Sequence, residues 1–259
     1  MSLTNLSNSR AELVRRKAIG RLTLSGPALM LFARSIFSFL AQALIAGIYT
    51  LQSSPKPWLD AARWFPVYAT LIDAGCLLAL WVLTRREGIS LRDLFSFDRS
   101  RWRGDVLLGL CLIPISLLFI FAGIRGSSYL VFGTWQPPAL FQRLPLSAAL
   151  YGVLVFPAIW GLTEQMTYNG YLVPRFRVLS GRTSVAVAVV SFAWSFQHAL
   201  QPLTFDPHFM LYRLLAPIPH TVFIILVYLR IRRLLPLVIA HWLMDAADVF
   251  ATVLLPILR

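Results

Sequence analysis

Long apolar stretches separated by short polar segments dominate the pattern of the chain. Seven of them can be delimited, at residues 26–51, 65–84, 106–123, 147–179, 183–203, 209–230 and 235–257. A bilayer core about 30 Å thick needs about 20 apolar residues per helix, so each stretch is long enough, or nearly so, to cross it. The pattern predicts an all-α, polytopic transmembrane helix bundle of about seven spans. A basic segment, 1–25, would precede a single transmembrane domain, 26–259.

The composition agrees with this fold class. Of 259 residues, 58% are hydrophobic and 14% are charged, against roughly 45–50% and about 25% in soluble domains. The net charge of +13 is compatible with nucleic-acid binding, but Lys and Arg cluster between the apolar stretches and form no basic face interleaved with aromatic residues. We therefore expect a lipid bilayer and no nucleic acid as partner. Cys76 and Cys111 lie in apolar runs and are interpreted as packing residues.

Segments rich in Lys and Arg alternate with segments poor in them. The basic segments are 7–21, 84–105, 174–182 and 229–234, and the poor ones are 52–65, 124–146 and 204–208. The positive-inside rule then places the N terminus in the cytoplasm. The first apolar stretch is too long for a cleaved signal peptide and is expected to be retained. We expect an integral protein of a bacterial cytoplasmic membrane, with Arg175 and Arg177 projecting into the cytoplasm.

Few ionisable residues lie inside the apolar stretches, and each is a functional candidate because a charged group in lipid costs several kcal/mol unless it is paired or hydrated. They are Arg34, Asp73, Glu164, His198, Arg213, His220, His241, Asp245 and Asp248. Arg34 and Asp73 differ by about 4–5 Å in depth and are predicted to pair. Arg213 is interpreted as reaching the outer interface. His220 follows two prolines and is interpreted as structural or lumen-lining.

Three of these residues are predicted to meet around one cytoplasm-facing cavity. Glu164 lies 15 residues before position 179 and His198 lies 15 residues after position 183, so an antiparallel hairpin brings them to one level. His241 enters from the same side to a depth of about 12 Å, compared with about 16 Å for Glu164. Asp245 and Asp248 follow His241 at i+4 and i+7 and share its helix face.

Such a cluster supports hydrolysis. A buried carboxylate can take a proton from water that a neighbouring histidine holds, and a second histidine can stabilise the oxyanion of a tetrahedral intermediate. This route requires no cofactor. Alternatively, Glu164, His198 and His241 could hold a divalent metal such as zinc. The spacing alone leaves both routes open.

The sequence around these residues resembles the type II CAAX prenyl endopeptidase family, also called the CPBP or ABI family of intramembrane proteases. Its three motifs are similar to "EQMTYNGYL" from Glu164, "WSFQH" from Trp194 to His198 and "HWLMD" from His241 to Asp245, within residues 80–250. The resemblance implies an endopeptidase that cuts a membrane-embedded or membrane-anchored peptide near the cytoplasmic face. The resemblance also implies that Glu164 and His198 activate water, while His241 and Asp245 stabilise the oxyanion or bind a metal.

The first motif is degenerate. The family has Glu-Glu-x-x-x-Arg, but here Gln165 and Asn169 replace the second Glu and the Arg. At i, i+4 the two amides can form a neutral hydrogen-bonded brace. Gln165, Asn169, Trp194 and Asp248 are expected to support the residues that act on the substrate. The alternative is a non-catalytic immunity or scaffold membrane protein of the same fold. A transporter is disfavoured because no internal repeat is visible.

Overall fold

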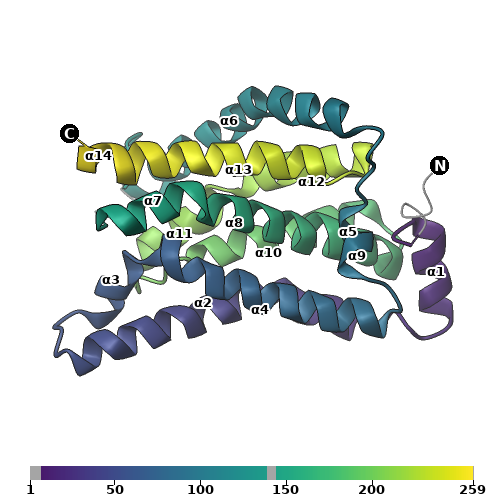
Figure 1. Cartoon of the computed structure of the whole chain (residues 1–259), viewed down its shortest axis with the longest axis horizontal. Coiled ribbons are helices and arrows are strands. Elements are labelled where there is room, and N and C mark those ends of the chain that lie inside the picture. The colour runs from purple at the N-terminus through teal and green to yellow at the C-terminus, as the bar shows by residue number, and fades with distance from the viewer. Residues whose placement is uncertain (1–6, 139–143, 259) are drawn as a thin grey trace.

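The computed structural model describes residues 7–138 and 144–258, and these residues form helices and connecting turns without a strand (Figure 1). Six helices are long and apolar enough to span a membrane, which confirms a polytopic all-α bundle. They are α2 (Ser25–Leu51), α4 (Phe65–Arg86), α6 (Trp102–Phe132) and the composite helices at Leu146–Ser180, Pro207–Ile231 and Leu235–Leu258.

The stretch predicted at 183–203 is shorter than expected. Its helix, α10 (Thr183–Ala199), has 17 residues and would be about 25 Å long at about 1.5 Å per residue, less than the hydrocarbon thickness. It ends before Pro202, which lacks an N–H group and disfavours helical geometry in the residue before it. The helix nevertheless packs inside the bundle, against α2, α9 (Val173–Ser180), α11 (Pro207–Leu215) and α12 (Ile218–Ile231).

The stretch predicted as one tilted helix at 147–179 consists of four consecutive helical pieces. These are α7 (Leu146–Leu154), α8 (Phe156–Gln165), the π-helical segment η2 (Met166–Leu172) and α9 (Val173–Ser180). Pro157 and Pro174 each lie at the start of a piece, where a missing N–H costs least. π-helical segments are rare and are frequently found at functional sites. Here one directly follows Glu164 and Gln165.

Two further stretches also differ from the prediction. The stretch predicted as one helix over 209–230 consists of two helices, α11 (Pro207–Leu215) and α12 (Ile218–Ile231), which are separated at Pro217. The segment expected to be a loop at 124–146 begins with the last residues of α6, and part of it lies outside the described residues. The last composite helix comprises α13 (Leu235–Val249), the π-helical η3 (Phe250–Leu254) and α14 (Leu255–Leu258). The short helices are α1 (Arg10–Ala18), α3 (Pro57–Ala62) and α5 (Leu91–Phe95).

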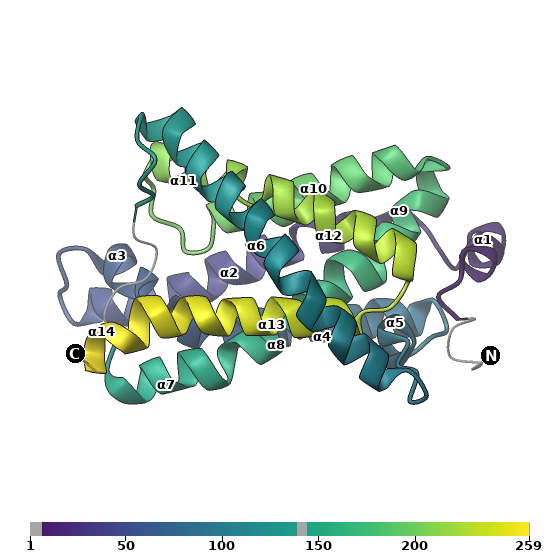
Figure 2. The ribbon, with the colours of Figure 1, turned by 90° about the horizontal axis from the view of Figure 1, so that it is seen from above.

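Helix α6 crosses α12 and α13 at close range (Figure 2). A Cβ added at Gly109 would lie 2.9 Å from the carbonyl oxygen of Pro236. One added at Gly123 would overlap the carbonyl oxygen of Ala216. Small residues at such crossings let helix backbones approach closely, as is common in membranes.

Of the two cysteines, Cys76 is buried as a packing residue should be, whereas Cys111 on the outer side of α6 is exposed. The interpretation of Cys111 as a packing residue is therefore wrong.

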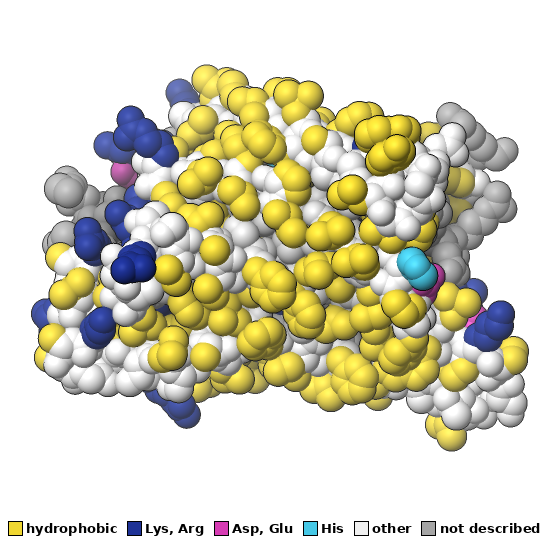
Figure 3. Space-filling view, turned by 180° about the vertical axis from the view of Figure 1, so that it is seen from behind, with side chains coloured by type: hydrophobic (Ala, Val, Ile, Leu, Met, Phe, Trp, Pro, Cys, Tyr) yellow, Lys and Arg dark blue, Asp and Glu magenta, His cyan; other side chains and the backbone are white. Residues whose placement is uncertain are grey.

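The basic N-terminal helix α1 lies across the end of the bundle (Figure 1). Its Lys17 Nζ donates to the carbonyl oxygens of Val178 and Leu179 at 3.3 Å. A hydrogen bond from Arg15 lowers the pKa of Glu12 to about 2, so Glu12 is charged at neutral pH. Many Lys and Arg side chains gather at this end, and hydrophobic side chains cover the middle of the molecule (Figure 3).

Arg175 does not project from the bundle as the sequence suggested. It is fully buried, and its Nε and Nη2 donate to the two oxygens of Glu87 at 2.9 and 2.6 Å. It also donates to the carbonyl oxygen of Tyr171 at 3.0 Å and lies over that ring. The pair joins α9 to the end of α4. A buried guanidinium is stable here because its donors are satisfied.

Candidate active site

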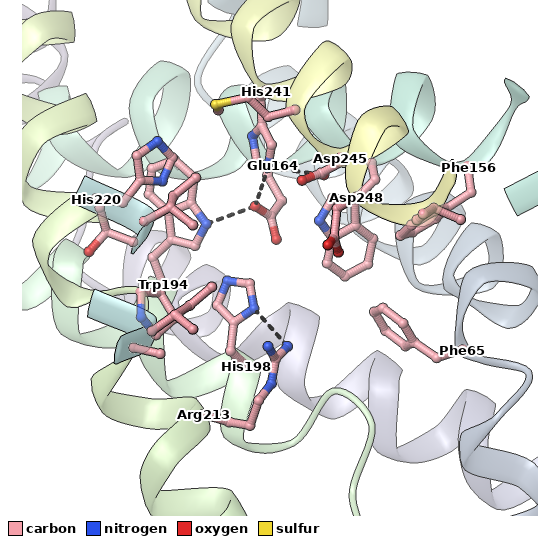
Figure 4. Close-up of a pocket in the computed structure, with 18 residues that line it drawn as sticks. Phe65, Phe156, Glu164, Trp194, His198, Arg213, His220, His241, Asp245 and Asp248 are labelled. Carbon is pink, nitrogen blue, oxygen red and sulfur yellow. Dashed lines mark hydrogen bonds and ion pairs between the residues drawn. The ribbon is translucent and has the colours of Figure 1, made fainter. Parts of the chain in front are cut away.

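A cavity of about 170 Å³ lies between α8, α10, α13 and the α11–α12 turn (Figure 4). Its wall contains all four residues predicted to act on a substrate, two that were expected to support them, and two further ionisable residues of the apolar stretches. These eight residues are Glu164, Trp194, His198, Arg213, His220, His241, Asp245 and Asp248. The predicted convergence of Glu164, His198 and His241 on one pocket is therefore observed.

Glu164, near the end of α8, is fully buried and held by donors from two other helices. Its Oε2 accepts from Trp194 Nε1 at 2.8 Å, and its Oε1 accepts a short hydrogen bond from Gln197 Nε2. Arg34 Nη2 lies 3.7 Å from Oε1. These groups offset the cost of burying a carboxylate. The carboxylate is thereby fixed at the pocket wall with a defined orientation.

Gln197, and not the predicted His198, is the residue of α10 whose side chain contacts Glu164 beside Trp194. No hydrogen bond links Glu164 directly to His198 among the described residues, and the neighbouring amide of Gln197 makes the contact. Trp194, Gln197 and His198 lie at i, i+3 and i+4 and thus share one face of α10. The spacing within "WSFQH" could have identified Gln197. His198 lines the pocket between Glu164 and Arg213 (Figure 4).

His241, in α13, contacts both carboxylates and the first motif. Its Nε2 lies 3.3 Å from Asp245 Oδ2 and 3.6 Å from Glu164 Oε2. Its Nδ1 lies 3.2 Å from Gln165 Nε2. With Gln165 as donor, neutral His241 carries its proton on Nε2, directed toward the two carboxylates. Asp245 and Gln165 thus fix the ring from its two ends.

The predicted brace between Gln165 and Asn169 is present. Asn169 Nδ2 donates to Gln165 Oε1 at 2.7 Å, and both side chains are fully buried. The structure adds that the brace continues to His241 through the Gln165 amide. Asp248, by contrast, lines the pocket but its carboxylate forms no hydrogen bond or ion pair with any described residue.

Arg34 and Asp73 form the predicted ion pair, with Nη1 2.9 Å from Oδ1. Arg34 also reaches the site, which the helical depths in the sequence do not predict. Its Nε donates to Gln197 Oε1 at 2.8 Å, and its guanidinium lies 4.1 Å from the centre of the Trp160 ring. Helices α2 and α4 therefore contribute a cation and a counter-ion to the surroundings of Glu164.

The donor set does not fit a metal ion. In the part of the chain that the structure describes, no group of three or more His, Cys, Asp or Glu side chains is arranged to hold one. Glu164, His198 and His241, the predicted ligands, are each engaged by protein donors or acceptors. The Arg34 guanidinium beside Glu164 would also repel a divalent cation. We derive no step that uses a metal.

Two of the three comparisons with known proteins found no match: neither curated proteins nor solved structures resemble the chain significantly. The third shows that residues 145–247 match the family described as type II CAAX prenyl endopeptidase Rce1-like. This segment holds Glu164 and the other predicted site residues except Asp248. Residues 145–247 are thus similar to the Rce1-like type II CAAX prenyl endopeptidase family, in agreement with the motifs of the sequence.

Proposed function

We propose that the protein is an intramembrane endopeptidase that hydrolyses a peptide bond near the cytoplasmic face of the membrane. The observation that carries this proposal is the arrangement around Glu164. A buried carboxylate lies at the wall of a cavity that His198 and His241 also line. One substrate carbonyl can therefore be reached by Glu164 as the general base, by His198 as the group that positions water, and by His241 as the oxyanion donor.

In the proposed reaction a water molecule lies between Glu164 and His198. Glu164 takes one proton from the water while its oxygen attacks the carbonyl carbon of the peptide bond. His241 donates a hydrogen bond from Nε2 to the developing oxyanion, and Asp245 holds the ring in its orientation. Glu164 then returns the proton to the leaving nitrogen as the carbon–nitrogen bond breaks. The products are a new carboxyl group and a new amine.

The surrounding polar groups act through these four residues. Trp194 and Gln197 orient the two oxygens of Glu164. Gln165, held by Asn169, orients the ring of His241. These four surrounding residues are positioning residues, because their polar atoms contact Glu164, His241 or each other and do not act on the substrate.

The substrate is proposed to be a membrane-embedded or membrane-anchored peptide. Apolar and aromatic side chains line the cavity beside the polar ones, among them Phe65, Phe156, Trp160 and Met244. They suit the side chains of a peptide that arrives from the hydrocarbon region. In our proposal the basic end of the molecule with α1 faces the cytoplasm, as the positive-inside rule expects.

A non-catalytic immunity or scaffold role is the second candidate, because the first motif lacks the Glu and Arg of the family. The geometry favours the enzyme. Gln165 and Asn169 form a hydrogen bond with each other, and Gln165 contacts His241. This supports a neutral brace in place of the ion pair of the family.

The proposal is tested with purified protein and a library of apolar membrane peptides in ¹⁸O-labelled water. Mass spectrometry should find new C termini that carry ¹⁸O. Ser116→Ala serves as a folded control, since this buried hydroxyl forms no hydrogen bond with a described residue and does not line the cavity. Binding of peptides without any labelled product, across the whole library, would favour the scaffold role.

A further inference from the structure

Arg213, in α11, is a cation at the pocket wall that forms an ion pair with no carboxylate of the described residues. Its Nη2 lies 3.4 Å from His198 Nδ1 and donates to the carbonyl oxygen of Gln201 at 3.2 Å. Its Nε is buried and forms no hydrogen bond with a described residue. The guanidinium does not reach outward as the sequence suggested but points into the cavity, below the ring of His198 (Figure 4).

The other arginines of the bundle interior differ from Arg213. Arg34 is paired with Asp73, and Arg175 is paired with Glu87. Arg213 forms no ion pair within the described part of the chain. An unpaired cation at membrane depth is costly, and such residues mark sites for substrates or ions. The fork of a guanidinium matches a carboxylate, which it can bind through two parallel hydrogen bonds.

Asp248 is the acid within the pocket that could compete for Arg213. Both residues line the cavity, but no ion pair joins them. Asp245, the other aspartate of the wall, contacts His241 instead. Glu164 is engaged by Trp194 and Gln197. No carboxylate of the described residues therefore forms an ion pair with Arg213, and its guanidinium can accept an anion from outside.

We propose that Arg213 binds a carboxylate of the substrate peptide, so that the enzyme selects peptides with a negative charge close to the bond that is cut. This inference rests on the proposed function and names its substrate class. In the cavity, His198 lies between Arg213 and Glu164 (Figure 4). At about 3.3–3.6 Å per extended residue, the carboxylate belongs within a few residues of the scissile bond. It is either a free C terminus or the side chain of Asp or Glu.

The test measures peptide binding to protein carrying Glu164→Gln, which is not expected to cleave. Two pairs of apolar decapeptides are compared in lipid nanodiscs. One pair differs in a C-terminal free acid or amide, and in the other, both amidated, an internal Asp is exchanged for Asn. We expect about 10- to 100-fold tighter binding of the carboxylate form in at least one pair, as for a charge-assisted hydrogen bond. The pair that responds identifies the source of the carboxylate.

Arg213→Gln, added to Glu164→Gln, should remove this preference by weakening the carboxylate form while leaving the neutral form unchanged. Arg213→Lys keeps the charge without the fork and should retain part of the preference, which provides a second variant if Arg213→Gln fails to fold. Asp248→Asn should strengthen carboxylate binding by removing the competing acid. Equal binding within both pairs, or a preference that survives Arg213→Gln, would overturn the inference.

The outcomes separate this inference from the proposed function. Cleavage by the unmodified protein without any carboxylate preference would leave the endopeptidase intact and refute the role of Arg213. A carboxylate preference in binding without cleavage would establish the Arg213 site and refute the endopeptidase.

Discussion

At the residue scale, the site depends on side chains that each satisfy two partners. The Gln165 amide uses its oxygen for Asn169 and its nitrogen for His241. A carboxylate at this position would offer His241 only an acceptor and would add a charge beside Glu164. Retaining a neutral amide therefore keeps the tautomer of His241 that directs Nε2–H toward the cavity.

Replacing Gln165 by Met should lower both stability and activity. Met has a similar length but bonds neither Asn169 nor His241, so a buried amide loses its partner at a cost of about 1–3 kcal/mol. The freed His241 ring should reduce the cleavage rate further. Thermal unfolding in detergent and the rate on one peptide check the two effects.

Thr167→Val is the matched control. This buried hydroxyl lies two residues away and has no hydrogen-bond partner among the residues that the structure describes, so its loss should change neither quantity appreciably. Equal effects of Gln165→Met and Thr167→Val would contradict the role of the brace.

At the scale of elements, buried ion pairs join helices that are distant in the sequence. Arg34 and Asp73 join α2 to α4 and extend to Glu164 in α8. Arg175 and Glu87 join α9 to α4. Such pairs add little net stability compared with apolar packing, but the loss of one partner strands a buried charge.

For Arg34 and Asp73 we expect stability and activity to respond differently. Arg34→Met and Asp73→Leu should each cost several kcal/mol, and the double variant should cost less than the sum. Activity should stay low in the double variant, since Gln197 and Glu164 have lost the contact with Arg34. A double variant that regains activity along with stability would show that Arg34 serves the fold alone.

For Arg175 and Glu87 the expected effect is on the fold. Arg175→Leu should destabilise the protein by about 3–5 kcal/mol, whereas Arg175→Leu with Glu87→Leu should recover much of the loss. Arg177→Leu, two residues along the same helix, is the control because Arg177 forms no ion pair with a described residue. Urea or thermal unfolding of the four proteins gives the comparison. Similar losses in Arg175→Leu and Arg177→Leu would count against the pair.

At the scale of the whole molecule, sequence periodicity predicted the bundle because apolar stretches of bilayer length have few other solutions. Helical depth counted along the chain brought Glu164, His198 and His241 to one level, and paired Arg34 with Asp73. Counting depth does not give the direction in which a side chain points. For this reason the sequence did not predict that Gln197, and not His198, donates a hydrogen bond to Glu164. It also did not predict that the side chains of Arg175 and Arg213 point into the bundle. The π-helical segment η2 likewise depends on packing that the sequence pattern does not reveal.

The most direct measurement of the central claim compares the unmodified protein with Glu164→Gln, recording binding and cleavage of the same membrane peptide in the same sample. Gln keeps the size of Glu164 and some of its hydrogen bonds but cannot accept a proton from water. We expect equal folding by thermal unfolding, binding within a few-fold, and a cleavage rate lower by about 10²- to 10⁴-fold, the contribution of a general base. Undiminished cleavage by Glu164→Gln would contradict the proposed mechanism, because it would remove Glu164 from the chemistry.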